Sequence, residues 1–337
     1  MSWVLEGPAF AAHRHDGTAC LEGGLVLAPG REEGVFRATL PLGAPVDRAV
    51  TSLGPDPWPE GGGARVRLRA LVPGPEGAPA WTPWAPLGCY GSGQGLPRSE
   101  VGPDPGLIEV RTDEVHLPRP ALRLELRVEL TRGAGAGPRL RRVAVCAWKS
   151  GPPPPEAPGP ASPAWGRELA VPERAQGVED PAIAGRICSP TSLAMVLAFH
   201  GVELPTAEVA RRVYDQGAKI YGNWSFNVAA AAELGLRAVV ARCASFAPLE
   251  AEVAAGRPAV ISHRWGPGEL PEAPMDSTEG HLIVVRGFTP QGDPIVNDPA
   301  GNPRRGAATR RVYPRQRVAR SWLRNGSGVC YLLAPGP

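Results

Sequence analysis

The chain has 337 residues, 43% of them hydrophobic and 20% charged, which is enough apolar material for two folded domains and excludes a wholly disordered protein. The formal net charge is only +3 and no run of Lys or Arg stands out, which argues against nucleic acid as the main partner. No apolar stretch reaches the length of a membrane span, and the first residues lack the pattern of a signal peptide. We therefore expect no transmembrane segment and, by default, a cytoplasmic location.

The region before residue 151 has the pattern of antiparallel strands. From Leu122 to Leu130, apolar and charged residues alternate without interruption, as in a strand with one buried face. Turns rich in Gly, Pro and Asp separate this segment from similar ones. Further strands are expected at residues 35–42, 66–69, 107–117 and 140–148. Residues 1–150 are therefore predicted to form an all-β sandwich.

One motif in this region suggests a ligand. Trp81-Thr82-Pro83-Trp84 places two large aromatic side chains close together in the sequence. Such a pair can form an aromatic platform for a glycan or a protein, or it can serve as a packing motif of the sandwich. Both interpretations remain open, and a glycan or protein is the candidate ligand of this domain.

A proline-rich segment divides the chain. Residues 151–160 read Gly-Pro-Pro-Pro-Pro-Glu-Ala-Pro-Gly-Pro, a composition that favours extended polyproline conformations over helix or sheet. Residues 151–164 are therefore predicted to be a linker and residues 165–337 a second domain. Because each side has its own apolar pattern, we expect residues from about Trp165 onward to fold as a separate unit.

Helices and strands mix in the second domain, so the predicted fold class of the whole chain is α+β. Capping residues and terminal glycines indicate helices, and short apolar runs indicate strands. The helices are expected at residues 191–200, 206–214, 225–234, 248–255 and 318–323, and the strands at 259–262, 282–287, 294–297 and 329–333.

Cys188 stands where the first of these helices begins. Ser189 and Thr191 offer capping oxygens, and Pro190 suits the first helical turn. The positive end of the helix dipole favours a thiolate at this position. A His and then an Asp or Asn follow in the chain, which is the order in which distant segments assemble a papain-like cysteine nucleophile.

The remaining cysteines do not suggest chemistry of their own. All six cysteines lie far apart in the sequence and form no CxxC pair, so no zinc site, other metal site or cofactor is predicted. Cys243 and Cys330 are interpreted as buried strand residues that behave as small hydrophobes.

His281 is the predicted general base. It opens a strand directly after Gly280, and a glycine there leaves room for a substrate backbone to approach. Asp298 closes the next strand and is the predicted orienting acid, with Pro299 restricting its backbone to extended conformations. Asn297 is adjacent and remains an alternative for the orienting role.

Other residues complete the predicted site. Gln176 is the only Gln between the linker and Cys188, and its side-chain amide, with the Cys188 backbone N–H, is the candidate oxyanion hole. Trp224 and Trp265 are candidate walls of a substrate cleft, or else partly buried core residues. His263 is a rival base at the end of a strand, but no acid follows it in an equivalent position.

Taken in order, these motifs resemble the C39-like peptidase family, a branch of the papain-like fold, over roughly half of the chain. The resemblance rests on Val171-Pro172 with Gln176, Cys188-Ser189-Pro190-Thr191-Ser192 with Met195, Tyr221-Gly222-Asn223-Trp224, Gly280-His281-Leu282, Gly287-Phe288-Thr289 and Asn297-Asp298-Pro299. It implies that Cys188 is the nucleophile, His281 the general base, Asp298 the orienting acid and Gln176 an oxyanion donor. Ile187 departs from the aromatic residue that usually precedes the cysteine in this family.

We therefore expect a cysteine peptidase that cleaves an amide bond of a peptide or amide substrate through a Cys-His-Asp triad and an acyl-enzyme. One alternative keeps the nucleophile and makes the protein an acyltransferase or amidase that acts on a small molecule or a cell-wall peptide. Another is a non-catalytic module that binds a glycan or a protein, because a fold does not guarantee an activity.

Overall fold

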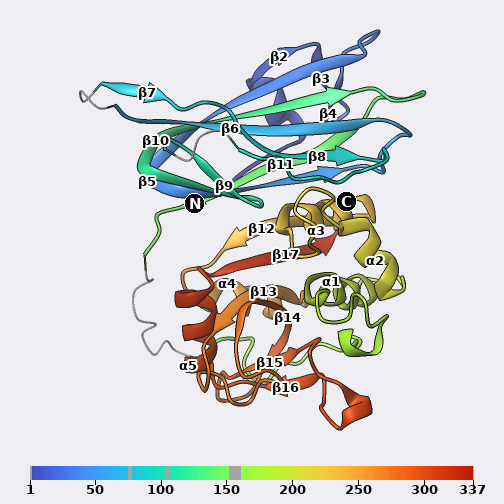
Figure 1. The fold of residues 1–337 in the computed structure, drawn as a ribbon, viewed down its shortest axis with the longest axis vertical. Coiled ribbons are helices and arrows are strands. Elements are labelled where there is room, and N and C mark those ends of the chain that lie inside the picture. Colours follow the sequence, from blue (N-terminus) through green and yellow to red (C-terminus); the bar gives the residue numbers. More distant parts are fainter. Residues whose placement is uncertain (1, 75–77, 103–105, 152–160, 337) are drawn as a thin grey trace. The chain divides into compact units, whose positions relative to one another are not determined.

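The computed structural model describes residues 2–74, 78–102, 106–151 and 161–336 and is α+β, as predicted (Figure 1). The chain divides into two compact units. Unit 1 contains Met1–Ser150 and Tyr214–Gly235, and unit 2 contains Gly151–Val213 and Leu236–Pro337. Most of the predicted linker, residues 152–160, lies outside the described residues. The division at the linker stays a prediction, to which the structure adds that Tyr214–Gly235 packs with unit 1.

Unit 1 is built on an 11-stranded sheet whose main path runs β3-β4-β11-β5-β10-β6-β7. Four further strands pair with members of this path: β1 with β11, β2 with β5, β8 with β6 and β9 with β10. The strands are β1 (Ser2–Glu6), β2 (Arg14–Asp16), β3 (Thr18–Leu21), β4 (Gly24–Leu27), β5 (Glu33–Pro55), β6 (Gly63–Pro73), β7 (Pro79–Trp81), β8 (Ala85–Gly91), β9 (Glu109–Arg111), β10 (Glu114–Thr131) and β11 (Arg139–Trp148), with a 3-10 helix η1 (Gly7–Ala12) after β1.

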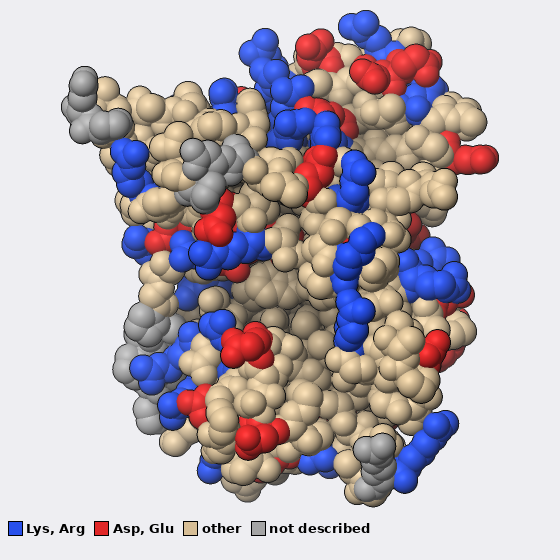
Figure 2. Space-filling model, viewed as in Figure 1, with Lys and Arg blue, Asp and Glu red and all other residues tan. Residues whose placement is uncertain are grey.

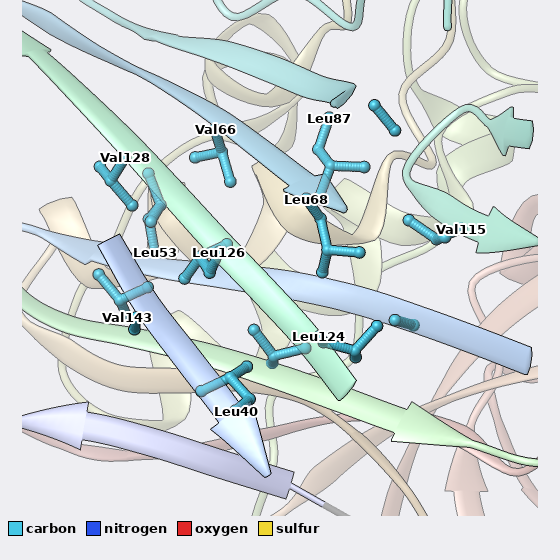
Figure 3. Close-up of a cluster of buried hydrophobic side chains, with 14 of the residues drawn as sticks. Leu40, Leu53, Val66, Leu68, Leu87, Val115, Leu124, Leu126, Val128 and Val143 are labelled. Atoms are coloured by element: carbon cyan, nitrogen blue, oxygen red, sulfur yellow. The ribbon is translucent and has the colours of Figure 1, made fainter. Parts of the chain in front are cut away.

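Long strands let this sheet fold over on itself. The first half of β5 pairs with β10, where Leu40 lies opposite Leu124, and its second half pairs with β11, where Leu53 lies opposite Val143. Because side chains alternate along a strand, these residues and Leu126 all point into one core. Figure 3 shows their side chains gathered between the strands. The layers thus form the sandwich that the alternating pattern predicts.

The Trp81-Thr82-Pro83-Trp84 motif packs on the sandwich itself. The guanidinium of Arg69 on β6 lies 4.6 Å from the ring centres of both Trp81 and Trp84, and the hydroxyl of Thr82 accepts a hydrogen bond from the Ala70 N–H at 3.0 Å. Arg69 also donates to Glu125 at 2.6 Å. The two rings therefore stack on an arginine of the same unit, which matches the packing interpretation.

Helix α3 (Trp224–Glu233) belongs to the core of unit 1 although it follows the linker in sequence. The ring of Phe226 lies 4.9 Å from the ring of Tyr90 in an edge-to-face arrangement, and the Ser225 N–H donates to the buried carboxylate of Asp113 at 3.0 Å. Helix α3 thus buries its apolar face among the strands of unit 1, and the expectation that residues from about Trp165 onward fold alone stays a prediction.

Unit 2 contains a six-stranded antiparallel sheet in the order β12-β17-β13-β14-β15-β16. Helix α1 packs against β14, which pairs with β13 and β15. The elements are η2 (Gln176–Val178, 3-10), α1 (Cys188–Phe199), α2 (Thr206–Val213), β12 (Leu236–Arg242), α4 (Ala247–Ala254), β13 (Ala259–Trp265), β14 (Thr278–Phe288), β15 (Pro294–Asn297), η3 (Pro303–Arg305, 3-10), β16 (Arg310–Val312), α5 (Arg315–Val318), η4 (Ala319–Asn325, a π-helix) and β17 (Val329–Pro335).

The predicted helices and strands of the second domain are confirmed to within a few residues, with two differences. The segment expected as one helix at residues 318–323 is the end of α5 followed by the π-helix η4, and strands β12 and β16 were not predicted. Within the described residues, no helix combines the length and apolar character needed to cross a membrane. In Figure 2, acidic and basic side chains lie intermixed on the face shown.

Candidate active site

Cys188 is the first residue of α1, as predicted, and is only partly buried. The capping residues act differently from the prediction. Ile187 occupies the N-cap position and has no side-chain oxygen, while the Thr191 hydroxyl donates to the Ile187 carbonyl at 2.7 Å. The Ser189 N–H is directed to the Cys188 sulfur instead. This hydrogen bond and the positive end of the helix dipole therefore favour negative charge on the Cys188 sulfur.

Two serines of α1 hold the helix on the sheet. The Ser189 hydroxyl lies 2.9 Å from the Tyr331 hydroxyl on β17, and the Ser192 hydroxyl donates to the Leu282 carbonyl on β14 at 2.9 Å. The Leu282 N–H in turn bonds to the Cys188 sulfur. Because Leu282 follows His281, these contacts fix Cys188 beside the strand that carries the predicted base.

His281 and Asp298 meet in the interior of unit 2, where they are 2% and 0% exposed. His281 Nε2 lies 2.7 Å from Asp298 Oδ1. The same carboxylate accepts hydrogen bonds from the Tyr313 hydroxyl at 2.6 Å and from the Ala300 N–H at 2.8 Å. Since Nε2 is engaged with Asp298, Nδ1 is the ring nitrogen left for the hydrogen bond between His281 and Cys188.

Charge partners outweigh burial in this cluster. Burial alone would lower the pKa of His281, but the charge and hydrogen bond of Asp298, with a further contribution from Cys188, raise it to about 10. Burial would raise the pKa of the Cys188 thiol and of Asp298. The hydrogen bond and charge of His281 instead hold the pKa of Cys188 below its ordinary value and that of Asp298 at about 2. The cluster therefore favours a thiolate, an imidazolium and a carboxylate in contact.

Asn297, the alternative to Asp298, points elsewhere. Its amide nitrogen donates to the carbonyls of Val171 and Pro172 at 3.2 Å each, and its Oδ1 accepts from Arg286 Nη1 at 2.9 Å. The structure thus places Asp298, and not Asn297, against His281. Asn297 holds the segment that leads to Gln176.

Gln176 begins the 3-10 helix η2 and is 8% exposed. Its backbone N–H donates to the carbonyl of Pro299 at 2.8 Å, which ties it to the loop that follows Asp298. Its side-chain Oε1 is buried and has no hydrogen-bond partner among the described residues. Its role as an oxyanion donor stays a prediction, and an amide anchored through its backbone suits that role.

His263 and Trp265 pack behind His281. His263 lies opposite His281 in the register of β13 and β14, with the two rings stacked 5.7 Å apart. Burial, together with the charge of His281, lowers the pKa of His263 to about 3, so it is neutral and contacts Ser321 rather than an acid. Trp265 is 2% exposed and its ring lies 6.0 Å from that of His281. This burial favours the core interpretation of Trp265.

Gly280 and Trp224, the other predicted substrate contacts, differ in their surroundings. Gly280 is exposed beside His281, and a Cβ atom there would meet nothing within 4 Å. Trp224 is the half-buried first residue of α3 and belongs to unit 1. The contact of either residue with a substrate stays a prediction. No group of three or more His, Cys, Asp or Glu side chains in the described part of the chain is arranged to hold a metal ion.

Sequence reasoning missed Tyr313. This fully buried residue follows β16 and donates to the Asp298 oxygen that His281 leaves free. Burial and the neighbouring carboxylate raise the pKa of its hydroxyl well above the ordinary value, so it stays a donor. The available signal was weak: a tyrosine next to a proline, after a three-residue strand whose sequence, Arg310-Arg311-Val312, shows no clear alternation.

The comparison with protein families bears on this cluster. Residues 168–330 match the family described as the Peptidase_C39 like family, and this range contains Gln176, Cys188, His281 and Asp298. This part of the chain is therefore similar to the C39-like peptidase family. The resemblance inferred from the sequence is confirmed, and the match supports cysteine peptidase activity in general terms.

The chain was also compared with solved structures. One similar structure is described as a double glycine motif protease from an AMS/PCAT transporter in complex with the leader peptide; it is 23% identical, and the match covers 50% of this chain and 94% of that chain with a TM-score of 0.33. Among curated proteins, none matches the chain.

Proposed function

We propose that this C39-like protein is a cysteine peptidase that hydrolyses an amide bond of a peptide or amide substrate through a covalent acyl-enzyme. The observation that carries the proposal is the contact series from the half-buried Cys188, through His281, to the fully buried Asp298 at 2.7 Å from the imidazole. The family match of residues 168–330 supports the same reaction class.

Each group has a defined task in the proposed reaction. The Cys188 thiolate attacks the carbonyl carbon, and the negative charge moves to the carbonyl oxygen, which the Gln176 amide and the Cys188 N–H stabilise. His281 Nδ1–H gives its proton to the leaving amine as the carbon–nitrogen bond breaks, which leaves a thioester. His281 then accepts a proton from water, the hydroxide attacks the thioester, and the carboxylic acid leaves. Asp298 keeps the imidazole oriented throughout.

Thiol reactivity tests the nucleophile without knowledge of the substrate. We expect iodoacetamide at mildly acidic pH to label Cys188 first, because His281 lowers the pKa of this thiol. Cys89 is a matched comparison, since it is also only partly buried and burial raises its pKa. Peptide mapping that finds Cys89 labelled rapidly and Cys188 inert would contradict the assignment.

A variant tests the reaction itself. Cys188→Ala should abolish hydrolysis of a mixed peptide pool and leave the melting temperature close to that of the wild type, whereas Cys89→Ala should retain hydrolysis. Residual hydrolysis in Cys188→Ala would exclude the proposed nucleophile. Product analysis with an added amine separates the alternative, because an acyltransferase would give the new amide in place of the acid.

A further inference from the structure

Two cysteines outside the candidate active site lie in contact with each other. The sulfur atoms of Cys243 and Cys330 are 3.6 Å apart, and the residues are 87 positions apart in the sequence. They are 3% and 1% exposed. The sequence predicts both to be buried strand residues; both are buried, but Cys243 lies just after β12, and the contact between them was not predicted.

The backbone holds these two side chains on one face of the sheet. Cys330 lies on β17 opposite Ala241 of β12, and Cys243 follows β12 two residues further along. Because side chains alternate along a strand, Ala241 and Cys243 share a face, and it is the face of Cys330. The Cys243 N–H donates to the Gly328 carbonyl at 2.9 Å, so the pairing of the two strands continues to this position.

The surroundings of the two sulfurs are mainly apolar, apart from the Ala241 carbonyl, which accepts a hydrogen bond from Cys330 Sγ at 3.6 Å. Both residues belong to the apolar core of unit 2, together with Phe246, Ile261 and Trp322. A disulfide requires a sulfur–sulfur distance of about 2.05 Å and side chains that point toward each other. A shortening of about 1.5 Å by side-chain rotation would satisfy that distance. The 3.6 Å separation of the two sulfurs is therefore the observation that favours a cross-link.

We propose that Cys243 and Cys330 are a disulfide-forming pair that becomes cross-linked when the chain folds under oxidising conditions. A disulfide of low molecular weight, such as oxidised glutathione, is the oxidant. The thiolate of one cysteine attacks a glutathione sulfur and releases one glutathione thiol. The second cysteine then attacks the mixed disulfide and releases the other, so that two protein thiols become one disulfide and one oxidised glutathione becomes two reduced ones.

The cross-link would affect the unfolded chain more than the folded one. It closes a ring of the residues between Cys243 and Cys330, which includes His281, Asp298 and Tyr313 and excludes Cys188. Such a ring reduces the conformational freedom of the unfolded state, so the cross-linked protein is expected to melt at a higher temperature. Because Cys188 lies outside the ring, its thiol stays free for reaction.

Refolding of the full chain tests this proposal. The reduced, denatured protein is refolded in a buffer of reduced and oxidised glutathione and, in parallel, in dithiothreitol; free thiols are then alkylated under denaturing conditions. We expect Cys243 and Cys330 to escape alkylation after oxidative refolding, and all six cysteines to be alkylated in dithiothreitol. A non-reduced peptide map should join Cys243 to Cys330, and the oxidised protein should melt roughly 5–15 °C higher.

Two variants serve as controls. Cys330→Ala should remove the cross-link and the difference in melting temperature. Cys146→Ala, which changes a cysteine of similar burial (2%) in unit 1, should retain both. Six alkylated cysteines after oxidative refolding, or cross-links that join other cysteines, would overturn the proposal. If a variant does not fold, the peptide map of the wild type decides by itself. If the wild type precipitates, the same map is made on native protein incubated with oxidised glutathione.

Discussion

Two buried aspartates, one in each unit, have opposite electrostatics. Asp298 in unit 2 is 0% exposed and Asp113 in unit 1 is 5% exposed. Burial opposes the charged form of both. The pKa of Asp298 is nevertheless lowered to about 2, because His281 supplies a positive charge. The pKa of Asp113 is raised to about 7, because burial, with a further contribution from the charge of Glu114, outweighs the hydrogen bonds from the backbone N–H groups of Ser225, Trp224 and Asp113.

The comparison shows that a counter-charge, and not the number of hydrogen bonds alone, keeps a buried carboxylate ionised. At Asp298 the ionised form is fixed, and the carboxylate can hold a positively charged imidazole. At Asp113 the carboxylate accepts hydrogen bonds from the first turn of α3 and helps to hold that helix in unit 1. The same residue type thus contacts a charged imidazole in one unit and the start of a helix in the other.

The largest effect is expected when Asp298 is replaced by Asn, and the same substitution at Asp113 serves as the control. Asp298→Asn should lower kcat/KM roughly 100- to 10,000-fold, because the imidazole loses its orienting charge. Its loss should also move the alkaline limit of activity from near pH 10 toward the ordinary pKa of histidine, 6.5, since the imidazolium is then no longer stabilised. The measurement is the pH profile of kcat/KM.

Asp113→Asn is the matched control for that experiment. It removes a buried carboxylate of the same type, and its kcat/KM should stay within about twofold of the wild type when expressed per folded molecule. An Asp298→Asn enzyme that keeps both its rate and its alkaline limit would show that the carboxylate does not orient His281.

The contact of Cys188, His281 and Asp298 could be predicted because local patterns mark these three residues, while their catalytic roles stay predictions. A helix start marks Cys188, a strand start marks His281, and a strand end before proline marks Asp298. Tyr313 could not be predicted, because it depends on the pairing of the short strand β16 with β15, and three residues carry too little pattern to show that pairing. Long-range contacts of short elements are set by the tertiary structure.

The fold, like the site, has features that local sequence patterns predict and features that they do not. Alternation over residues 122–130 predicts β10 and a buried face, and the structure confirms the strand and the buried face from Leu124 to Leu130, whereas Leu122 is exposed beside a register shift. The membership of α3 in unit 1 could not be predicted, because an apolar helix face shows that it will be buried but not against which partner. Contacts such as the bond from Trp58 Nε1 to Glu233 at 2.9 Å join residues 175 positions apart, and no local pattern announces them.

The next largest effect is the pH dependence that Asp113 gives to the free energy of unfolding. Asp113 binds a proton more tightly in the folded protein than in the unfolded chain, since its pKa rises from 3.8 to about 7 on folding. Its contribution to stability is therefore fully present below about pH 4 and is lost as the pH rises through about 7. Asp113→Asn removes this dependence. The stability of the variant relative to the wild type should increase by roughly 2–4 kcal/mol between pH 4 and pH 8.

Urea unfolding of both proteins at the two pH values measures that difference. Groups that titrate equally in both proteins cancel in the subtraction, so the result reports on Asp113. A difference that stays constant with pH would mean that Asp113 is already ionised in the folded protein, and the contrast with Asp298 would disappear.

A smaller effect separates the neighbours Asn297 and Asp298. Asn297→Ala leaves the carbonyls of Val171 and Pro172 and the guanidinium of Arg286 without this partner, so unfolding should become easier by roughly 1–3 kcal/mol. Activity per folded molecule should change little. Active-site titration with a thiol reagent gives the folded fraction. A large fall in kcat with unchanged stability would instead assign the orienting role to Asn297.

The smallest effect is expected at Tyr313. Tyr313→Phe keeps the buried ring and removes only the hydroxyl that donates to Asp298 Oδ2 at 2.6 Å. Asp298 retains His281 and the Ala300 N–H, so the variant should lose roughly 1–2 kcal/mol of stability and less than about tenfold in kcat/KM. The acid limit of stability should move upward, because loss of this donor raises the pKa of Asp298 and its stabilising contribution is then lost at a less acidic pH. Acid unfolding monitored by tryptophan fluorescence measures the shift. If Tyr313→Phe loses as much activity as Asp298→Asn, the hydroxyl and not the carboxylate alone fixes the imidazole, and the contrast between the two aspartates rests on this third residue.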